Sequence, residues 1–163
     1  MLEKSFETDR LIFREINAGD AKDIVAFRSK PAVFRYFKNP HQITIEEHLN
    51  WYENRYLSDD DRIDFMCVEK ESSNKVGVFG IVMKNGSAEV NYLLSDSAQH
   101  KGYASEAVNG LMEYAKKMFG IRIFTAEIHK DNLASINLAK RLGFVEHFED
   151  GEFITFKLEK IKG

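Results

Sequence analysis

The chain has 163 residues, 44% hydrophobic and 30% charged, with a formal net charge of −3. This length favours one domain spanning residues 1–163, the slight acidic excess argues against a nucleic-acid partner, and no apolar run approaches the roughly 20 residues of a membrane-spanning helix, so no membrane partner is expected. Cys67 is the only cysteine, so an internal disulfide is excluded and a cytoplasmic location is expected.

The first third of the chain is predicted to form a strand and two helices. Residues 10–16 are a short apolar run, which is typical of a strand. Apolar residues at helical spacing predict a helix over 18–29, which should end at Lys30 because the residue before a proline disfavours helical angles. Thr44 and Glu47 have the spacing of a capping box, so a second helix should begin after Thr44.

Three consecutive strands are expected next. The apolar runs 63–68 and 76–83 are separated by polar residues that are typical of a turn. Asn85-Gly86 is a tight-turn dipeptide, and a third strand follows over 88–94. Because the connections are short, these strands should pair antiparallel.

The second half of the chain alternates between helices and strands. The pattern predicts a helix over 104–115, a strand over 121–128, a helix over 131–142 that Gly143 ends, and strands near 144–148 and 153–158. A helix between two strands usually forms a crossover that makes the strands parallel. We therefore expect an α/β (α+β) fold with a mixed, mostly antiparallel sheet and helices on both faces.

The segment 99–105 is the most informative loop, because it lies between a strand and the start of a long helix. The first backbone N–H groups of a helix are unpaired and attract anions. Gly102 and Ala104 have no bulky side chain, so the backbone can approach a phosphate, and Lys101 adds a cation. A plain helix start with a glycine in its loop is the alternative explanation.

Three segments together resemble the GNAT acetyltransferase superfamily. Its cofactor loop, Gln/Arg-x-x-Gly-x-Gly/Ala, is matched by Gln99, Gly102 and Ala104. Its later motif, an asparagine followed by a serine-bearing helix and Gly-Phe, is matched by Asn132, Ser135 and Gly143-Phe144. The opening residues 7–14 look like the RimJ/RimL branch, and the resemblance extends over residues 7–158.

The resemblance implies acetyl-CoA as co-substrate and no metal. It implies a GNAT fold, in which the strand before the loop splays from its parallel neighbour and the backbones of Leu93 and Leu94 pair with pantetheine. By the same resemblance the pyrophosphate is held by the loop, which contains Gln99, Lys101, Gly102, Tyr103, Ala104 and Ser105. Asn132 would bind the pantetheine arm, and Lys140 would contact the cofactor phosphates, although Lys140 is equally well explained by the dipole of its helix.

Acetyl transfer to an amine requires a base, because an alkyl ammonium has a pKa near 10. Glu89 is the predicted catalytic base by resemblance, and an inert, exposed strand glutamate is the alternative. The tyrosine that often serves the family as general acid is absent, since Ala139 occupies its position. Ser135 is the second predicted catalytic residue, as a donor to the departing sulfur; a bond to a helix carbonyl would give it a structural role, and water is the alternative donor.

We therefore expect an acetyl-CoA-dependent N-acetyltransferase that acts by direct attack of a primary amine in a ternary complex. The acceptor is a protein N-terminal amine or a small-molecule amine, and an amino-sugar nucleotide or a polyamine is the alternative. A CoA-binding module without catalysis is the alternative of a different class. Residues 33–57 should cover the acceptor cleft. The sequence does not distinguish a monomer from a homodimer.

Overall fold

The structure, a computed structural model, describes residues 4–98 and 101–160. Eight strands form one sheet in the order β1-β2-β3-β4-β5-β6-β8-β7. β5 and β6 pair in parallel, and the other neighbouring strands pair antiparallel. The strands are β1 (Ser5–Glu7), β2 (Leu11–Glu15), β3 (Arg62–Glu69), β4 (Lys75–Lys84), β5 (Ser87–Leu94), β6 (Ile123–His129), β7 (Val145–Asp150) and β8 (Phe153–Glu159). The expected mixed, mostly antiparallel sheet is confirmed.

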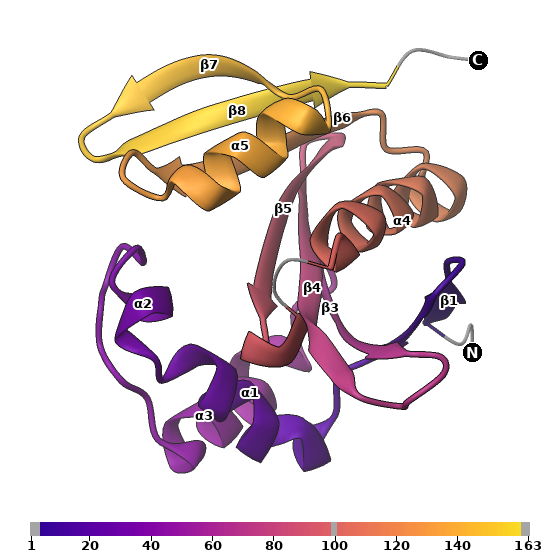
Figure 1. Ribbon diagram of the computed structural model, residues 1–163, viewed down its shortest axis with the longest axis vertical. Coiled ribbons are helices and arrows are strands. Elements are labelled where there is room, and N and C mark those ends of the chain that lie inside the picture. The colour runs from indigo at the N-terminus through magenta and orange to yellow at the C-terminus, as the bar shows by residue number, and fades with distance from the viewer. Residues whose placement is uncertain (1–3, 99–100, 161–163) are drawn as a thin grey trace.

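Helices cover both faces of this sheet, as expected. One face carries α4 (Tyr103–Phe119) and α5 (Leu133–Arg141), and the other carries α1 (Ala21–Arg28), α2 (Pro31–Phe34) and α3 (Ile45–Trp51). Figure 1 shows α1, α2 and α3 gathered at one end of β5, while α5 lies with β6, β8 and β7 at the other. Short helical turns at Ala18–Asp20, Tyr52–Tyr56 and Asp96–Ala98 complete the helices. Within the described residues, none of these helices has the length and apolarity needed to cross a membrane.

Local sequence signals account for several helix ends. Thr44 Oγ1 accepts a hydrogen bond from the Glu47 N–H, and Glu47 Oε1 accepts one from the Thr44 N–H, so the predicted capping box begins α3. α1 ends at Arg28, just before the predicted end at Lys30, and Pro31 then begins the four-residue helix α2. The sequence did not predict α2, although proline is favoured in the first turn of a helix.

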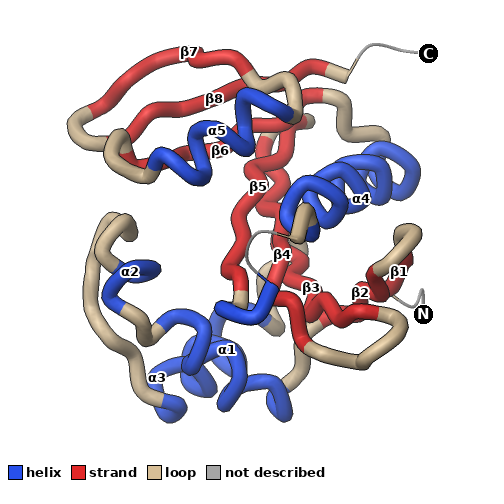
Figure 2. Tube along the Cα trace, viewed as in Figure 1, coloured by secondary structure: helices blue, strands red, loops and turns tan. Residues whose placement is uncertain are grey.

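Alternation along β5 divides its side chains between the two faces of the sheet. Val90, Tyr92 and Leu94 pack with the core under α4 and α5, which also includes Leu111, Phe124, Phe79 and Phe156. Leu93 packs with the smaller core under α1 and α3. Glu89 and Asn91 share the Leu93 face, because successive residues of a strand point to opposite faces. β5 therefore presents side chains to both sides of the sheet. Figure 2 shows the strand in the middle of the molecule, with α4 beside it and α1 near its end.

Gly77 of β4 leaves no room for a side chain beside the end of β5. The register of β3 and β4 shifts beside it, and Gly77 lies opposite Leu94. A Cβ atom at Gly77 would lie 2.0 Å from the carbonyl oxygen of Leu93, so a side chain at this position does not fit. The backbone of Leu93 and Leu94 is therefore positioned by contact with a glycine.

Candidate active site

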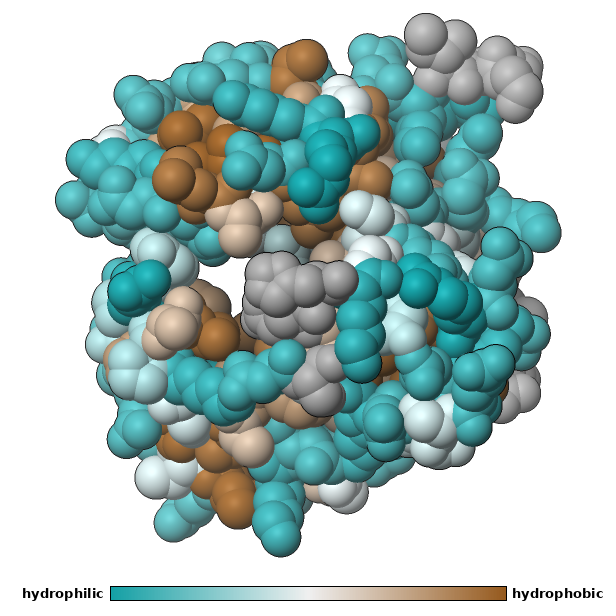
Figure 3. Space-filling view, viewed as in Figure 1, coloured by the Kyte–Doolittle hydropathy of each residue, from teal (hydrophilic) through white to brown (hydrophobic). Residues whose placement is uncertain are grey.

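The parallel strands β5 and β6 separate soon after they meet. Their described pairing runs from Ser87 opposite Ile123 to Glu89 opposite Thr125, although β5 continues to Leu94 and β6 to His129. Between the diverging strands lies a cavity of about 650 Å³. It is lined by residues of β5, β6, α5 and the segment 30–38 that contains α2, here called the α2 segment. Figure 3 shows this hollow left of centre, between the two halves of the molecule.

Carboxylates lie on the α2 side of the cavity. Glu89 and Glu127 both line it, and they share one face of the sheet because Glu89 is paired with Thr125. Lys38 Nζ lies 2.7 Å from Glu127 Oε1. The Glu89 side chain is exposed, but loss of solvation near the surrounding protein still raises its pKa, and the nearby charge of Glu127 raises it further, against the smaller opposing effect of Lys38. A carboxyl group with a raised pKa beside an open cleft suits a general base.

Hydroxyl groups lie on the α5 side of the same cavity. Tyr92 Oη and Ser135 Oγ are 2.9 Å apart, and both residues line the cavity. Burial raises the pKa of Tyr92, which keeps the phenol protonated and able to donate to Ser135. The Ser135 proton is then free to point at a ligand.

Asn132 begins α5 at the edge of the cavity. Its Oδ1 accepts a hydrogen bond of 3.3 Å from the Ser135 N–H, which caps the helix. No described residue accepts from its Nδ2, and Asn132 lines the cavity. One side chain thus caps α5 and still offers a donor to a ligand, which fits the predicted contact with a pantetheine arm.

The predicted phosphate loop leads directly into α4. Gly102 is the N-cap residue and has a φ of 76°, in the left-handed region that favours glycine. Tyr103, Ala104 and Ser105 form the first turn of the helix, whose N–H groups have no partner within the helix. These amides and the exposed Lys101 fit the binding of a diphosphate. Gln99, the first residue of the loop motif, lies outside the described residues.

Of the other predicted cofactor residues, two line the cavity and one does not. Leu93 and Leu94 line the cavity along the free edge of β5. Lys140 is exposed on α5 and is not among the described residues that line the cavity, so its contact with cofactor phosphates stays a prediction.

Sequence reasoning missed Tyr92 and Glu127, both of which line the cavity. Tyr36 and Phe37, which follow α2, also line it and belong to the segment 33–57 that was expected to cover the acceptor cleft. Glu127 could have been found by counting two residues along β6 from the partner of Glu89. The approach of Tyr92 to Ser135 depends on the placement of α5, for which the sequence has no local signal.

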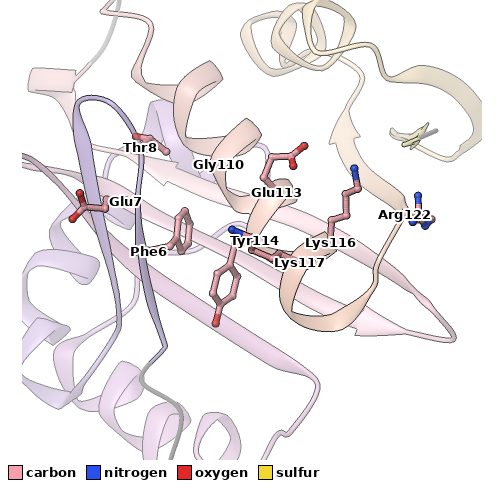
Figure 4. Close-up of a pocket in the computed structure, with 9 residues that line it drawn as sticks. All are labelled: Phe6, Glu7, Thr8, Gly110, Glu113, Tyr114, Lys116, Lys117 and Arg122. Carbon is pink, nitrogen blue, oxygen red and sulfur yellow. The ribbon is translucent and has the colours of Figure 1, made fainter. Parts of the chain in front are cut away.

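A second hollow, of about 590 Å³, lies between β1 and α4 (Figure 4). It is lined by Phe6, Glu7, Thr8, Gly110, Glu113, Tyr114, Lys116, Lys117 and Arg122, none of which the sequence predicts as a site residue. We therefore take the cavity between β5 and β6 as the candidate active site.

The chain is similar in sequence to known acetyltransferases. Residues 10–145 match the family described as acetyltransferase (GNAT) domain. The uncharacterized N-acetyltransferase YoaA of Bacillus subtilis is 29% identical over 85% of this chain and 81% of its own length. The spermidine N(1)-acetyltransferase of Vibrio cholerae is 23% identical over 94% of this chain and 90% of its own length.

Two solved structures have the same fold. Spermidine N-acetyltransferase from Vibrio cholerae, in complex with CoA and spermine, has a TM-score of 0.81 at 20% identity, over 94% of this chain and 97% of that chain. RimL, a ribosomal L7/L12 alpha-N-protein acetyltransferase in complex with coenzyme A, has a TM-score of 0.80 at 17% identity, over 96% and 98%.

The split parallel pair, the family match and these relatives define an acetyl-CoA-dependent N-acetyltransferase. The chain belongs to the GNAT acetyltransferase family. Its co-substrate is acetyl-CoA, which supplies an activated acetyl thioester. Among the described residues, no group of three or more His, Cys, Asp or Glu side chains could hold a metal ion.

Proposed function

We propose that this enzyme, as a single domain over residues 1–163, transfers the acetyl group directly to a primary amine in a ternary complex. One observation carries the proposal: Glu89 and Ser135 approach the same cavity from opposite faces of the sheet. The acceptor would enter from the α2 side and the thioester from the α5 side. The two meet only where β5 and β6 have separated.

Glu89 is the proposed base. Its carboxylate would take a proton from the acceptor ammonium, and the neutral nitrogen would then attack the thioester carbonyl carbon. The raised pKa of Glu89 supports this role, because a stronger base removes an ammonium proton more readily.

Ser135 is the proposed donor to the departing sulfur. Its hydroxyl proton is free for the sulfur when Tyr92 donates to Ser135 Oγ, an arrangement that the 2.9 Å contact permits because either oxygen can be the donor. In this way Tyr92 of β5 would orient the hydroxyl of Ser135 on α5. The helix α5 has Ala139 at the position where the family often has its acidic tyrosine.

The proposed binding residues form a path along the cavity to the start of α4. The β5 backbone at Leu93 and Leu94 would pair with the pantetheine arm, and Asn132 Nδ2 would donate to it. The N–H groups of residues 101–105 would hold the diphosphate. Lys140 would contribute charge at the outer end of α5.

The acceptor that we favour has a single ammonium group, as a protein N-terminus or a small monoamine does. A polyamine needs several unpaired carboxylates, but Asp96 is already paired with Lys30 and Glu127 with Lys38. Arg35 also lines the cavity, and no described carboxylate pairs with it. The positive charge of Arg35 would repel the additional ammonium groups of a polyamine.

An amine panel tests this assignment by measuring thiol release from acetyl-CoA. The panel contains a peptide with a free N-terminus, a simple monoamine, an amino-sugar nucleotide and spermidine. We expect a peptide or monoamine to have the highest kcat/KM. A preference for spermidine would contradict the acceptor assignment, and tight acetyl-CoA binding without thiol release for any amine would support a non-catalytic CoA-binding module.

We also propose that the enzyme belongs to the RimJ/RimL branch and is located in the cytoplasm. The opening run of residues 7–14 and the likeness to RimL support the RimJ/RimL branch, whereas the spermidine acetyltransferase relative supports the polyamine alternative. The buried free thiol of Cys67 is compatible with the reducing cytoplasm. A homodimer is the proposed alternative to a monomer.

A further inference from the structure

The N-terminal segment 6–10 lies along one face of α4. Phe6 stacks on Tyr114 with ring centroids 4.8 Å apart. One turn closer to the start of the helix, a Cβ atom at Gly110 would lie 2.5 Å from Thr8 Cγ2, so the glycine allows the segment to pack closely (Figure 4). The contacted residues recur every three or four positions, as one face of a helix requires.

At the start of α4 this segment makes its most specific contacts. Arg10 Nε donates to Glu106 Oε1 at 2.6 Å, and the Arg10 backbone N–H donates to Glu106 Oε2 at 2.8 Å. The Thr8 hydroxyl donates to the same Oε2 at 2.5 Å. Glu106 in the first turn of α4 is thus bound by three donors from the N-terminal segment.

Arg10 also reaches the loop before the helix. Its Nη1 donates to the carbonyl oxygen of Lys101 at 3.0 Å, and its guanidinium lies 4.5 Å from the centroid of the Tyr103 ring. Arg10 Nη2 lies 3.6 Å from the position of a Cβ at Gly102. One side chain therefore contacts Lys101 in the loop and Tyr103 in the first turn of the helix, on either side of Gly102.

Arg10 also offsets the negative charge of Glu106, which would otherwise repel the diphosphate of acetyl-CoA. Burial alone would raise the pKa of Glu106, but the hydrogen bonds from Thr8 and Arg10 outweigh it and lower the pKa, so the carboxylate is ionised at neutral pH. A bare carboxylate in the first turn would repel phosphates bound to the same amides. The Arg10–Glu106 ion pair reduces that repulsion.

We propose that Arg10 is a positioning residue for acetyl-CoA, which fixes the loop 101–105 through Glu106 and Lys101 so that its amides point at the diphosphate. This inference rests on the proposed function of that loop. It assigns a physical role to Thr8 and Arg10 of the run 7–14, which the sequence alone connected to a family resemblance.

The experiment compares Arg10→Met with Phe6→Ala, which loosens the other end of the same segment. We expect calorimetry to give a Kd for acetyl-CoA that is about tenfold higher for Arg10→Met. The KM for acetyl-CoA should rise while kcat and the KM for the amine are unchanged. Phe6→Ala should lower the melting temperature and leave the Kd unchanged. If Arg10→Met does not fold, Arg10→Lys keeps the charge but loses the two-point contact, and its Kd should also rise.

Two results would overturn the inference: a wild-type Kd for the folded Arg10 variant, or an equal loss of affinity in Phe6→Ala. A wild-type protein that binds no acetyl-CoA would instead contradict the proposed function, so the two failures are distinguishable.

Discussion

At the scale of single residues, the environment of Glu89 is the feature that most directly affects the chemistry. Its carboxyl group shares one face of the split sheet with Glu127, whose charge disfavours ionisation of Glu89. Lys38 bonds to Glu127 and partly offsets this effect. Desolvation by the surrounding protein is the largest cause of the raised pKa of Glu89, and two neighbours, one from β6 and one that follows α2, adjust it further.

The pH dependence of Glu127→Gln tests this arrangement. Glu89 must be ionised to act as a base, and its raised pKa means that it becomes protonated sooner as the pH falls. Removing the Glu127 charge and freeing Lys38 should both lower the pKa of Glu89. The acid limb of kcat/KM should therefore move to lower pH, so the activity of the variant relative to wild type increases as the pH falls.

Glu149→Gln is the matched control, because Glu149 is exposed on β7 and is not among the described residues that line the cavity. Its pH profile should equal that of wild type. An acid limb that is unchanged in Glu127→Gln would contradict the role of Glu89 as the base.

Glu89 itself could be predicted from the sequence, because it precedes the loop motif on a recognisable strand. Its pKa could not, since it depends on Glu127 and Lys38, which are 38 residues after and 51 residues before it in the chain. Likewise, Ser135 could be predicted because it belongs to a motif. Its contact with Tyr92 could not, because that contact depends on how α5 packs against β5.

At the scale of elements, the position of β5 depends on Gly77 of β4. The carbonyl oxygen of Leu93 occupies the space of the missing side chain. Because Leu93 and Leu94 form the proposed pairing edge for pantetheine, a change in β4 should affect binding without altering any residue that contacts the ligand.

Gly77→Ala should therefore lower both stability and affinity. The new methyl group would force β4 and β5 apart, at a cost of about 1–3 kcal/mol in the free energy of unfolding. We also expect a higher Kd for acetyl-CoA by calorimetry. Gly151→Ala is the control, because Gly151 has a φ of 62° but open space around it; it should lose stability through backbone strain alone. Equal affinities in the two variants would contradict the role assigned to Gly77.

Most elements could be predicted from the sequence, because they carry strong local signals: the capping box of α3, the Asn85-Gly86 turn and the helical stripe of α4. β1 and α2 were missed because three or four residues are too short for a periodic pattern. The close approach at Gly77 was missed because it depends on the pairing of two strands.

At the scale of the whole molecule, the split between β5 and β6 divides the sheet into two parts joined by three paired positions and the α4 crossover. The parallel pair could be predicted from the order of the elements, but its separation followed only from the resemblance to a family. The resemblance also led to the expectation that residues 33–57 cover the acceptor cleft, but the ion pairs of Lys30 and Lys38 with Asp96 and Glu127, on which the choice of acceptor depends, needed the structure.

Hydrogen–deuterium exchange with and without acetyl-CoA is the sharpest test of cofactor binding by the loop 101–105, since it reports on the backbone amides themselves. We expect slower exchange at residues 101–106 and along 90–94, with no change in the exposed edge strand β7. Unchanged exchange at 101–106 in a protein saturated with acetyl-CoA would contradict cofactor binding by this loop.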